Sequence, residues 1–344
     1  MFVRIVNRFV IAALATLVGC GEVSLEVVRT TVLDLDLGRE ANDGDLATLD
    51  WGVVALVNTT AFAFDDEDKP LWQREADAIL GARGDVVYLT QSGGITQVIG
   101  RDGFLQREYV DDVAGNVTLG TVADSDRVVA VDSRPEGCVV TSLRDGGLEW
   151  ETTLAERGCG TENSVTADAD GNVYVKVSPR SDDEAPTGLF FARLSPTGAL
   201  EWARPLVVDG KALTAAKFLR PNHWPNLALR HIGSYASDNE YTDLGSAVFD
   251  SDGEFDWYPR ARSGQQSVLD SRGNTLSASG SGWEISVARV EPDGARDSET
   301  LGPDTNIGAV LGVDVADNGD MLVLDSGGGF GKARFSRLRW STSR

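Results

Sequence analysis

Short apolar stretches alternate with turn residues along most of the chain. The clearest copy starts at a turn at 168–172, continues through apolar strands at 173–175 and 190–194, and ends in Leu200 and Trp202. Glycine beside Asn or Asp supplies the positive φ of tight hairpin turns, and β-branched and aromatic residues favour strands. No stretch after residue 20 shows a long apolar period of 3.6 residues. The pattern predicts an all-β chain.

The pattern recurs about every 45 residues, which is the length of a four-stranded propeller blade. One landmark is a tryptophan at the end of each copy, where it is expected to fill the space between adjacent sheets: Trp72, Trp150, Trp202, Trp257 and Trp340. In two further copies, after Gly103 and Gly294, polar residues replace the tryptophan. The spacing predicts a single β-propeller over residues 46–344 with seven four-stranded blades, and six or eight are the alternatives. Residues 228–262 match the pattern least.

The copy at 164–206 resembles the bacterial SBBP-type β-propeller repeats and, more distantly, the pyrroloquinoline-quinone-type repeats. The resemblance rests on residues in the expected order: Asp170, Gly171, Asn172, Tyr174, Val175, Leu194, Thr197, Gly198, Leu200 and Trp202. The other copies match in part. The resemblance implies a propeller that is usually exported, and it implies no reaction.

The N-terminus has the features of a lipoprotein signal peptide over residues 1–19. Arg4 and Arg8 precede a ten-residue apolar run at 9–18, which is too short to span a bilayer. The run ends at Cys20 in a sequence that resembles the bacterial lipobox, which implies a diacylglycerol on Cys20. Several acyl chains would hold the protein on the membrane. Gly21 follows the cysteine, so the outer membrane is favoured over the inner membrane within the cell envelope.

Residues 20–45 allow two expectations. They form either a flexible tether behind the lipid or, through the alternation at 32–37, an outer strand that helps to close the ring.

Acidic residues dominate the charge, with 53 Asp and Glu against 31 Lys and Arg and a formal net charge of −22. Removal of residues 1–19 would change this to about −24. Such a surface repels nucleic acid, so no nucleic-acid partner is expected.

Two cysteines remain besides Cys20. Cys138 and Cys159 are 21 residues apart, and an even pair in an oxidising compartment predicts a disulfide. Two buried free thiols are the alternative.

Candidate chemistry is sparse. The two histidines, His223 and His231, have no recognised zinc spacing, so we expect neither a metal site nor a cofactor. Calcium is a weaker alternative at the acidic turns 168–172 and 250–256, whose first role is expected to be structural. No catalytic residue is assigned.

Excess length lies in the two copies that end at Trp202 and Trp257, in expected loops at 178–188, 208–227 and 233–245. Long loops on a repeat scaffold often carry binding sites. The candidate partner-binding residues in these loops are Phe218, His223, Trp224, Tyr235 and Tyr241. The alternative is that the loops cover a sheet edge and bury their own aromatic residues.

Three functional hypotheses follow. The first is a lipid-anchored, non-enzymatic β-propeller that binds a protein or glycan, or acts as a scaffold, at the cell envelope. The second is an assembly-factor lipoprotein similar to the propeller component of the outer-membrane β-barrel machinery. The third is a hydrolase or lyase that acts on glycans in the central channel.

Overall fold

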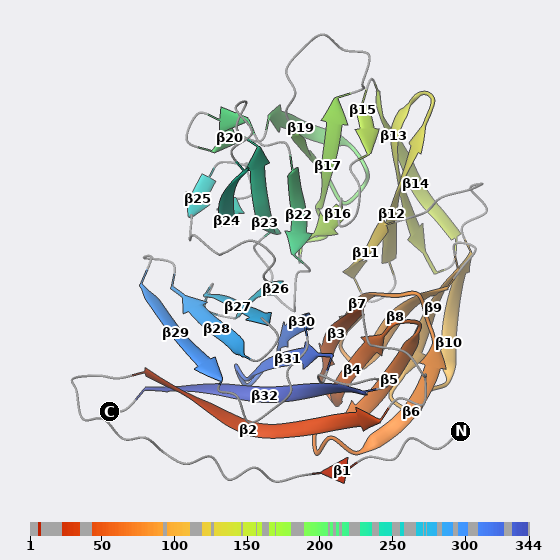
Figure 1. Ribbon diagram of the computed structural model, residues 1–344. Coiled ribbons are helices and arrows are strands. Elements are labelled where there is room, and N and C mark those ends of the chain that lie inside the picture. Colours follow the sequence, from red (N-terminus) through yellow and green to blue (C-terminus); the bar gives the residue numbers. More distant parts are fainter. Residues whose placement is uncertain are drawn as a thin grey trace. The chain divides into compact units, whose positions relative to one another are not determined.

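The chain is all β in the part that the structure describes. The computed structural model describes residues 6–7, 23–34, 43–91, 95–110, 119–124, 127–145, 147–155, 157–159, 165–168, 170–179, 189–205, 207–208, 211–212, 215–219, 228–235, 241–249, 255–257, 266–270, 272, 274–280, 284–291, 295–301, 309–326 and 332–342. The chain forms two compact units (Figure 1). Unit 1 comprises Met1–Ile79, Arg101–Gly103 and Gly264–Arg344, and unit 2 comprises Leu80–Gly100 and Phe104–Ser263.

The described residues of unit 1 form three antiparallel sheets. The first contains β3 (Gly44–Leu49), β4 (Gly52–Val57), β5 (Thr60–Asp65) and β6 (Pro70–Glu75) in chain order. The second contains β26 (Gln266–Leu269), β27 (Thr275–Gly280), β28 (Ile285–Val290) and β29 (Arg296–Leu301). This succession of neighbouring strands is the one expected of propeller blades.

The third sheet of unit 1 combines both ends of the chain. Its order is β1 (Val6–Asn7), β2 (Val23–Asp34), β32 (Lys332–Thr342), β31 (Met321–Asp325) and β30 (Val310–Val315). The long strands β2 and β32 lie side by side in Figure 1, and Val23 pairs with Thr342. Residues 23–34 therefore form the outer long strand of this sheet, and the two-residue strand β1 lies beyond it. The long strand begins well before the alternation at 32–37 that suggested it.

The part of unit 2 that the structure describes forms four larger sheets and a short hairpin. The first sheet contains β7 (Ala78–Arg83, which begins in unit 1), β8 (Val86–Gln91), β9 (Ile95–Gly100) and β10 (Leu105–Val110). The second contains β11 (Leu119–Asp124), β12 (Arg127–Arg134), β13 (Gly137–Arg144) and β14 (Gly147–Ala155), and the third contains β15 (Arg157–Cys159), β16 (Val165–Ala167), β17 (Val173–Pro179), β18 (Phe190–Leu194) and β19 (Leu200–Pro205). The hairpin consists of β20 (Val207–Val208) and β21 (Lys211–Ala212), and the fourth sheet contains β22 (Ala215–Leu219), β23 (Ala228–Tyr235), β24 (Tyr241–Phe249) and β25 (Phe255–Trp257).

The apolar cores lie between sheets. In unit 1, Phe64 of β5 packs on Phe335 of β32 with 5.1 Å between the ring centroids. In unit 2, Val140 of β13 and Val175 of β17 belong to one buried cluster. Side chains from neighbouring sheets interdigitate in this way because each sheet has apolar residues on both faces.

A β-bulge at the start of the outer strand sets the position of the recurring tryptophan. In unit 2, Leu143 pairs with Leu148 and Ser142 pairs with Trp150, so that one residue of β14 is left over. The same shift occurs before Trp72 and before Trp202. Trp72 and Trp150 contact the turn of the next sheet, as the structural interpretation of this landmark predicts.

Trp340 is an exception, and its assignment as the last copy of this landmark was wrong. It lies on β32, the third strand of its sheet, whereas the bulge of that sheet lies on the outer strand β2. There Arg29 pairs with Arg337 just after the shift, and Arg29 takes the tryptophan position. Only the pairing of the two chain ends reveals this, because Arg29 is distant in sequence from the rest of its sheet.

Asp68 connects the sheet of the chain ends to the first sheet of unit 1. Its carboxylate is 1% exposed and accepts hydrogen bonds from Thr31 Oγ1 (3.1 Å) and Arg337 Nε (3.0 Å). Arg29 Nη1 lies 3.3 Å from the same carboxylate and donates to the carbonyl of Asp66. One buried carboxylate in the β5–β6 turn thus holds residues from both β2 and β32.

We predict that Asp68→Asn lowers the free energy of unfolding by roughly 3 kcal/mol, because removal of one partner leaves buried arginine charge without compensation. Urea unfolding followed by tryptophan fluorescence measures the change. Glu67→Gln is the matched control, since Glu67 lies in the same turn and is 69% exposed. Equal stability of the two variants would contradict the assigned role of Asp68.

Candidate functional site

In unit 2, side chains of β12 and β14 contact the sheet that contains β17, β18 and β19. Trp150 Nε1 donates to the carbonyl of Pro196 (3.0 Å), which also accepts from Arg127 Nη1 (2.8 Å). Arg127 is 2% exposed, and its Nη2 donates to the carbonyl of Gly171 (2.7 Å). Gly198 has φ +82°, and a Cβ there would lie 2.6 Å from the Trp150 ring. The glycine turn is therefore required for the indole to pack against it.

The contact recurs in unit 1 with other residues. Trp72 Nε1 donates to the carbonyl of Arg101, and Arg74 donates to the carbonyl of Gly103. In unit 2, Thr152 donates to the carbonyl of Gly198. Two side chains of the outer strand thus bind the turn of the next sheet in both places. These residues stabilise the scaffold.

In the turn at 168–172, the carboxylate of Asp168 accepts hydrogen bonds from nearby residues of the same segment. Asp168 Oδ1 accepts from the Asn172 backbone (2.8 Å), and Oδ2 accepts from Asn172 Nδ2 (2.8 Å) and the Tyr174 hydroxyl (3.0 Å). Asp270 makes the same two bonds to Asn274. Both oxygens of Asp168 therefore support the turn, as its structural interpretation predicts. The second acidic turn, at 250–256, lies mostly outside the described residues.

Tyr174 joins this turn to an aromatic cluster. Its ring lies 5.6 Å from the Phe191 ring and 6.3 Å from the Trp202 ring, and the Arg193 guanidinium lies 5.8 Å from its centre. Burial raises the pKa of Tyr174 above its ordinary value of 10.0, and the neighbouring Asp168 carboxylate raises it further. The phenol therefore stays protonated and donates to Asp168.

The predicted disulfide between Cys138 and Cys159 is present in the structure, with 4.7 Å between the Cα atoms. Cys138 lies on β13 and is fully buried, whereas Cys159 ends β15, which pairs with β17 of the next sheet. The Cys159 backbone also donates to Ser133 Oγ (3.0 Å). The bond is thus a covalent link between two sheets of unit 2.

The candidate partner-binding residues are only partly in loops. Phe218 lies on β22, Tyr235 ends β23 and Tyr241 begins β24, and the two tyrosines pair directly across the strands. The loops expected at 208–227 and 233–245 are therefore shorter than predicted. His223, Trp224 and Cys20 lie outside the described residues.

Sequence reasoning missed a second set of candidates. The residue two positions before the recurring tryptophan is exposed at Trp150 and at Trp202. Leu148 is 66% exposed and Leu200 is 51% exposed, and Leu105 and Phe104 at the equivalent turn are 45% and 72% exposed. The available signal was the recurrence of an apolar residue at the very start of an outer strand.

Within the described ranges, no group of three His, Cys, Asp or Glu residues could hold a metal ion. A search of the same residues for a helix that is long and apolar enough to cross a membrane finds none.

Comparison with solved structures finds a similar fold in BamB from Moraxella catarrhalis. The TM-score is 0.52 at 15% sequence identity, and the match covers 91% of this chain and 100% of that chain. No family model and no curated protein matches the sequence. At this identity the similarity concerns the fold, which is β-propeller-like. The SBBP-type repeat at 164–206 stays a prediction.

We predict that replacement of both cysteines, Cys138→Ala with Cys159→Ala, lowers the free energy of unfolding by about 3 kcal/mol, because the unfolded chain gains conformational entropy. Thermal and urea unfolding under oxidising conditions measure the loss. The control is dithiothreitol, which should destabilise the wild type and leave the double variant unchanged. A wild type that is insensitive to dithiothreitol would contradict the prediction.

Tyr174→Phe tests the buried phenol. At neutral pH the variant loses the bond to Asp168, and we expect about 1 kcal/mol of destabilisation. The raised pKa of Tyr174 favours the protonated, folded state, so its contribution is constant below pH 10 and declines as the pH rises above 10, where the unfolded tyrosine ionises. The stability difference between wild type and variant, measured by urea unfolding, should therefore be equal at pH 6 and pH 8 and shrink above pH 10. A stability difference between wild type and variant that stays constant up to pH 11 would contradict the link between the ionisation of Tyr174 and folding.

Proposed function

We propose that this chain is a lipid-anchored β-propeller of the bacterial cell envelope that acts as a non-enzymatic binding module for a protein or glycan partner. The observation that carries the proposal is the similarity in fold to BamB over the whole of that chain. The Cys138–Cys159 bond supports an oxidising compartment. The outer membrane remains the favoured location, and Cys20 the proposed lipidation site.

In this proposal the sheets of four or five strands are the seven blades of one propeller. The chain ends share one blade, in which β2 supplies the outer strand. Since β2 begins at Val23, the chain between Cys20 and the blade is short. The extended chain from Cys20 to Val23 spans at most roughly 11 Å, so the lipid would hold the propeller close to the bilayer.

Partner binding is proposed at the end of the β23–β24 hairpin. Tyr235 and Tyr241 form the last pair of this hairpin, and Phe218 lies on the neighbouring strand β22. Aromatic residues contribute strongly to protein interfaces. His223 and Trp224, from the segment between β22 and β23, complete the proposed set.

A second candidate function is that of an outer-membrane assembly factor. The similarity to BamB favours it over a propeller with an unrelated envelope role. Isolation of envelope complexes distinguishes the two, because an assembly factor co-purifies with the β-barrel assembly machinery and an unrelated binding module does not.

Cys20→Ser tests the anchor. The variant should move from the membrane fraction to the soluble fraction of the envelope, because the acylated residue is absent. Cell fractionation with immunoblotting measures the distribution. Cys159→Ser is the matched cysteine control and should stay with the membrane. Equal membrane retention of the Cys20 variant would rule the anchor out.

A further inference from the structure

The exposed apolar residues of unit 2 occupy equivalent places in consecutive sheets. Leu105, Leu148 and Leu200 are each the last paired residue of an outer strand before the bulge, and Leu105 and Leu200 are also the first residues of their strands. Phe104 precedes Leu105 and is 72% exposed. These four residues are here called the leucine row.

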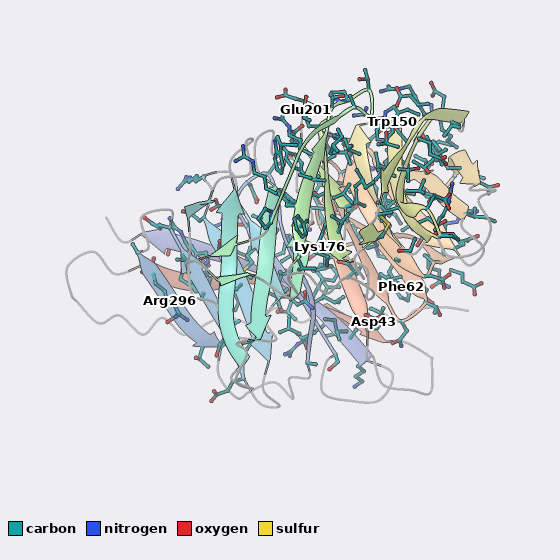
Figure 2. All side chains as sticks on the ribbon, turned by 90° about the horizontal axis from the view of Figure 1, so that it is seen from above. Asp43, Phe62, Trp150, Lys176, Glu201 and Arg296 are labelled. Atoms are coloured by element: carbon teal, nitrogen blue, oxygen red, sulfur yellow. A yellow bond between two sulfur atoms is a disulfide. The ribbon has the colours of Figure 1, made fainter. Side chains whose placement is uncertain are left out.

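Contacts between neighbouring sheets connect the row into one edge. Arg107 Nη1, two residues after Leu105, lies 2.9 Å from Asp145 in the β13–β14 turn. Trp150, two residues after Leu148, packs on Gly198 in the turn before Leu200. Figure 2 labels Trp150 and Glu201, and both lie at the same edge of unit 2. Each of these two outer strands therefore contacts the turn that precedes the next member of the row.

Most carboxylates along this edge are paired with arginines. The outer strands and turns from Phe104 onward carry five carboxylates: Glu108, Asp145, Glu149, Glu151 and Glu201. Four of them form ion pairs: Asp145 with Arg107, Glu149 with Arg144, Glu151 with Arg134 and Glu201 with Arg193. In three of these pairs the carboxylate is the more exposed partner, whereas Glu149 is 28% exposed against 37% for Arg144. Asp145 is 63% exposed against 37% for Arg107, and Glu201 is 38% exposed against 18% for Arg193. A solvent-facing partner thus meets leucines between carboxylates.

We propose that the leucine row is a docking surface for a protein segment that carries apolar side chains and a net positive charge. The inference rests on the proposed role as a binding module and names the chemistry of its partner. Apolar contacts at the row exclude water, and the surrounding carboxylates select a cationic segment over an acidic one. The formal net charge of −22 favours the same choice.

The test uses the full chain with Cys20→Ser and a fluorescent 14-residue peptide of leucine, lysine and serine. Two matched peptides replace either lysine by glutamate or leucine by serine. Fluorescence anisotropy at 150 mM salt measures the affinities. Only the peptide with both leucine and lysine should bind. Because the anchor is absent from this protein, failure of the anchoring proposal does not affect the outcome.

The row variant combines Phe104→Ser, Leu148→Ser and Leu200→Ser, and should weaken peptide binding by about tenfold or more. It leaves the charge unchanged, so purely electrostatic binding would not respond. The matched control is Val28→Ser with Leu71→Ser, whose residues are 39% and 38% exposed on unit 1, and it should bind as the wild type does. Phe104→Ser alone replaces the row variant if the melting temperature of the latter falls.

Three outcomes overturn the proposal: equal binding by the row variant, equal binding of the glutamate peptide, or no binding of any peptide. Row-dependent binding to phosphatidylcholine vesicles without peptide binding would identify a bilayer as the occupant. Row-dependent dimerisation in sedimentation would identify a second copy of the chain. Either result would replace the cationic protein segment and refute the inference.

Discussion

Central strands of the described sheets, such as β4 and β13, are buried on both faces, and the stability of such a sheet depends on the sheets that cover it. Strand β4 has five consecutive buried residues and β13 has seven, whereas a sheet with one solvated face would alternate. Such a sheet cannot exist alone in water, because either of its faces would expose a row of Val and Leu side chains. The contacts between sheets are therefore the interactions on which the rest of the structure depends.

Burial on both faces also places polar groups between the sheets, and each of them must find a partner there. Trp150 and Arg127 donate to the same carbonyl, that of Pro196, and Asp68 gathers Thr31, Arg29 and Arg337. Unpaired groups in these positions would cost more than the bonds contribute. These polar contacts specify how one sheet sits on the next, and the apolar clusters provide most of the free energy.

The same geometry separates structural residues from candidate binding residues. The bulge turns the tryptophan toward the next sheet, whereas the leucine two positions before it stays at the outer edge. A single recurring motif thus supplies one residue to the scaffold and one to the surface. The aromatic pair Tyr235 and Tyr241 belongs to a different edge, the end of the β23–β24 hairpin, so the two proposed surfaces have separate origins.

The sequence alone determined the local elements. Turn residues such as Gly171 and Gly198 marked hairpins, the alternation of apolar and turn residues predicted an all-β chain, and compartment and parity predicted the Cys138–Cys159 bond. These features depend on neighbours in sequence or on composition, so they can be read from the residues.

Tertiary structure decided what depends on residues far apart in the chain. Trp340 matched the motif in sequence, yet Arg29 holds the equivalent position, because β2 pairs with β32 from the opposite chain end. The exposure of Leu148 beside the part-buried Trp150 depends on a bulge whose register only the paired strand defines. A local pattern specifies a strand and its turns, but which face of that strand meets another sheet is a property of the pairing.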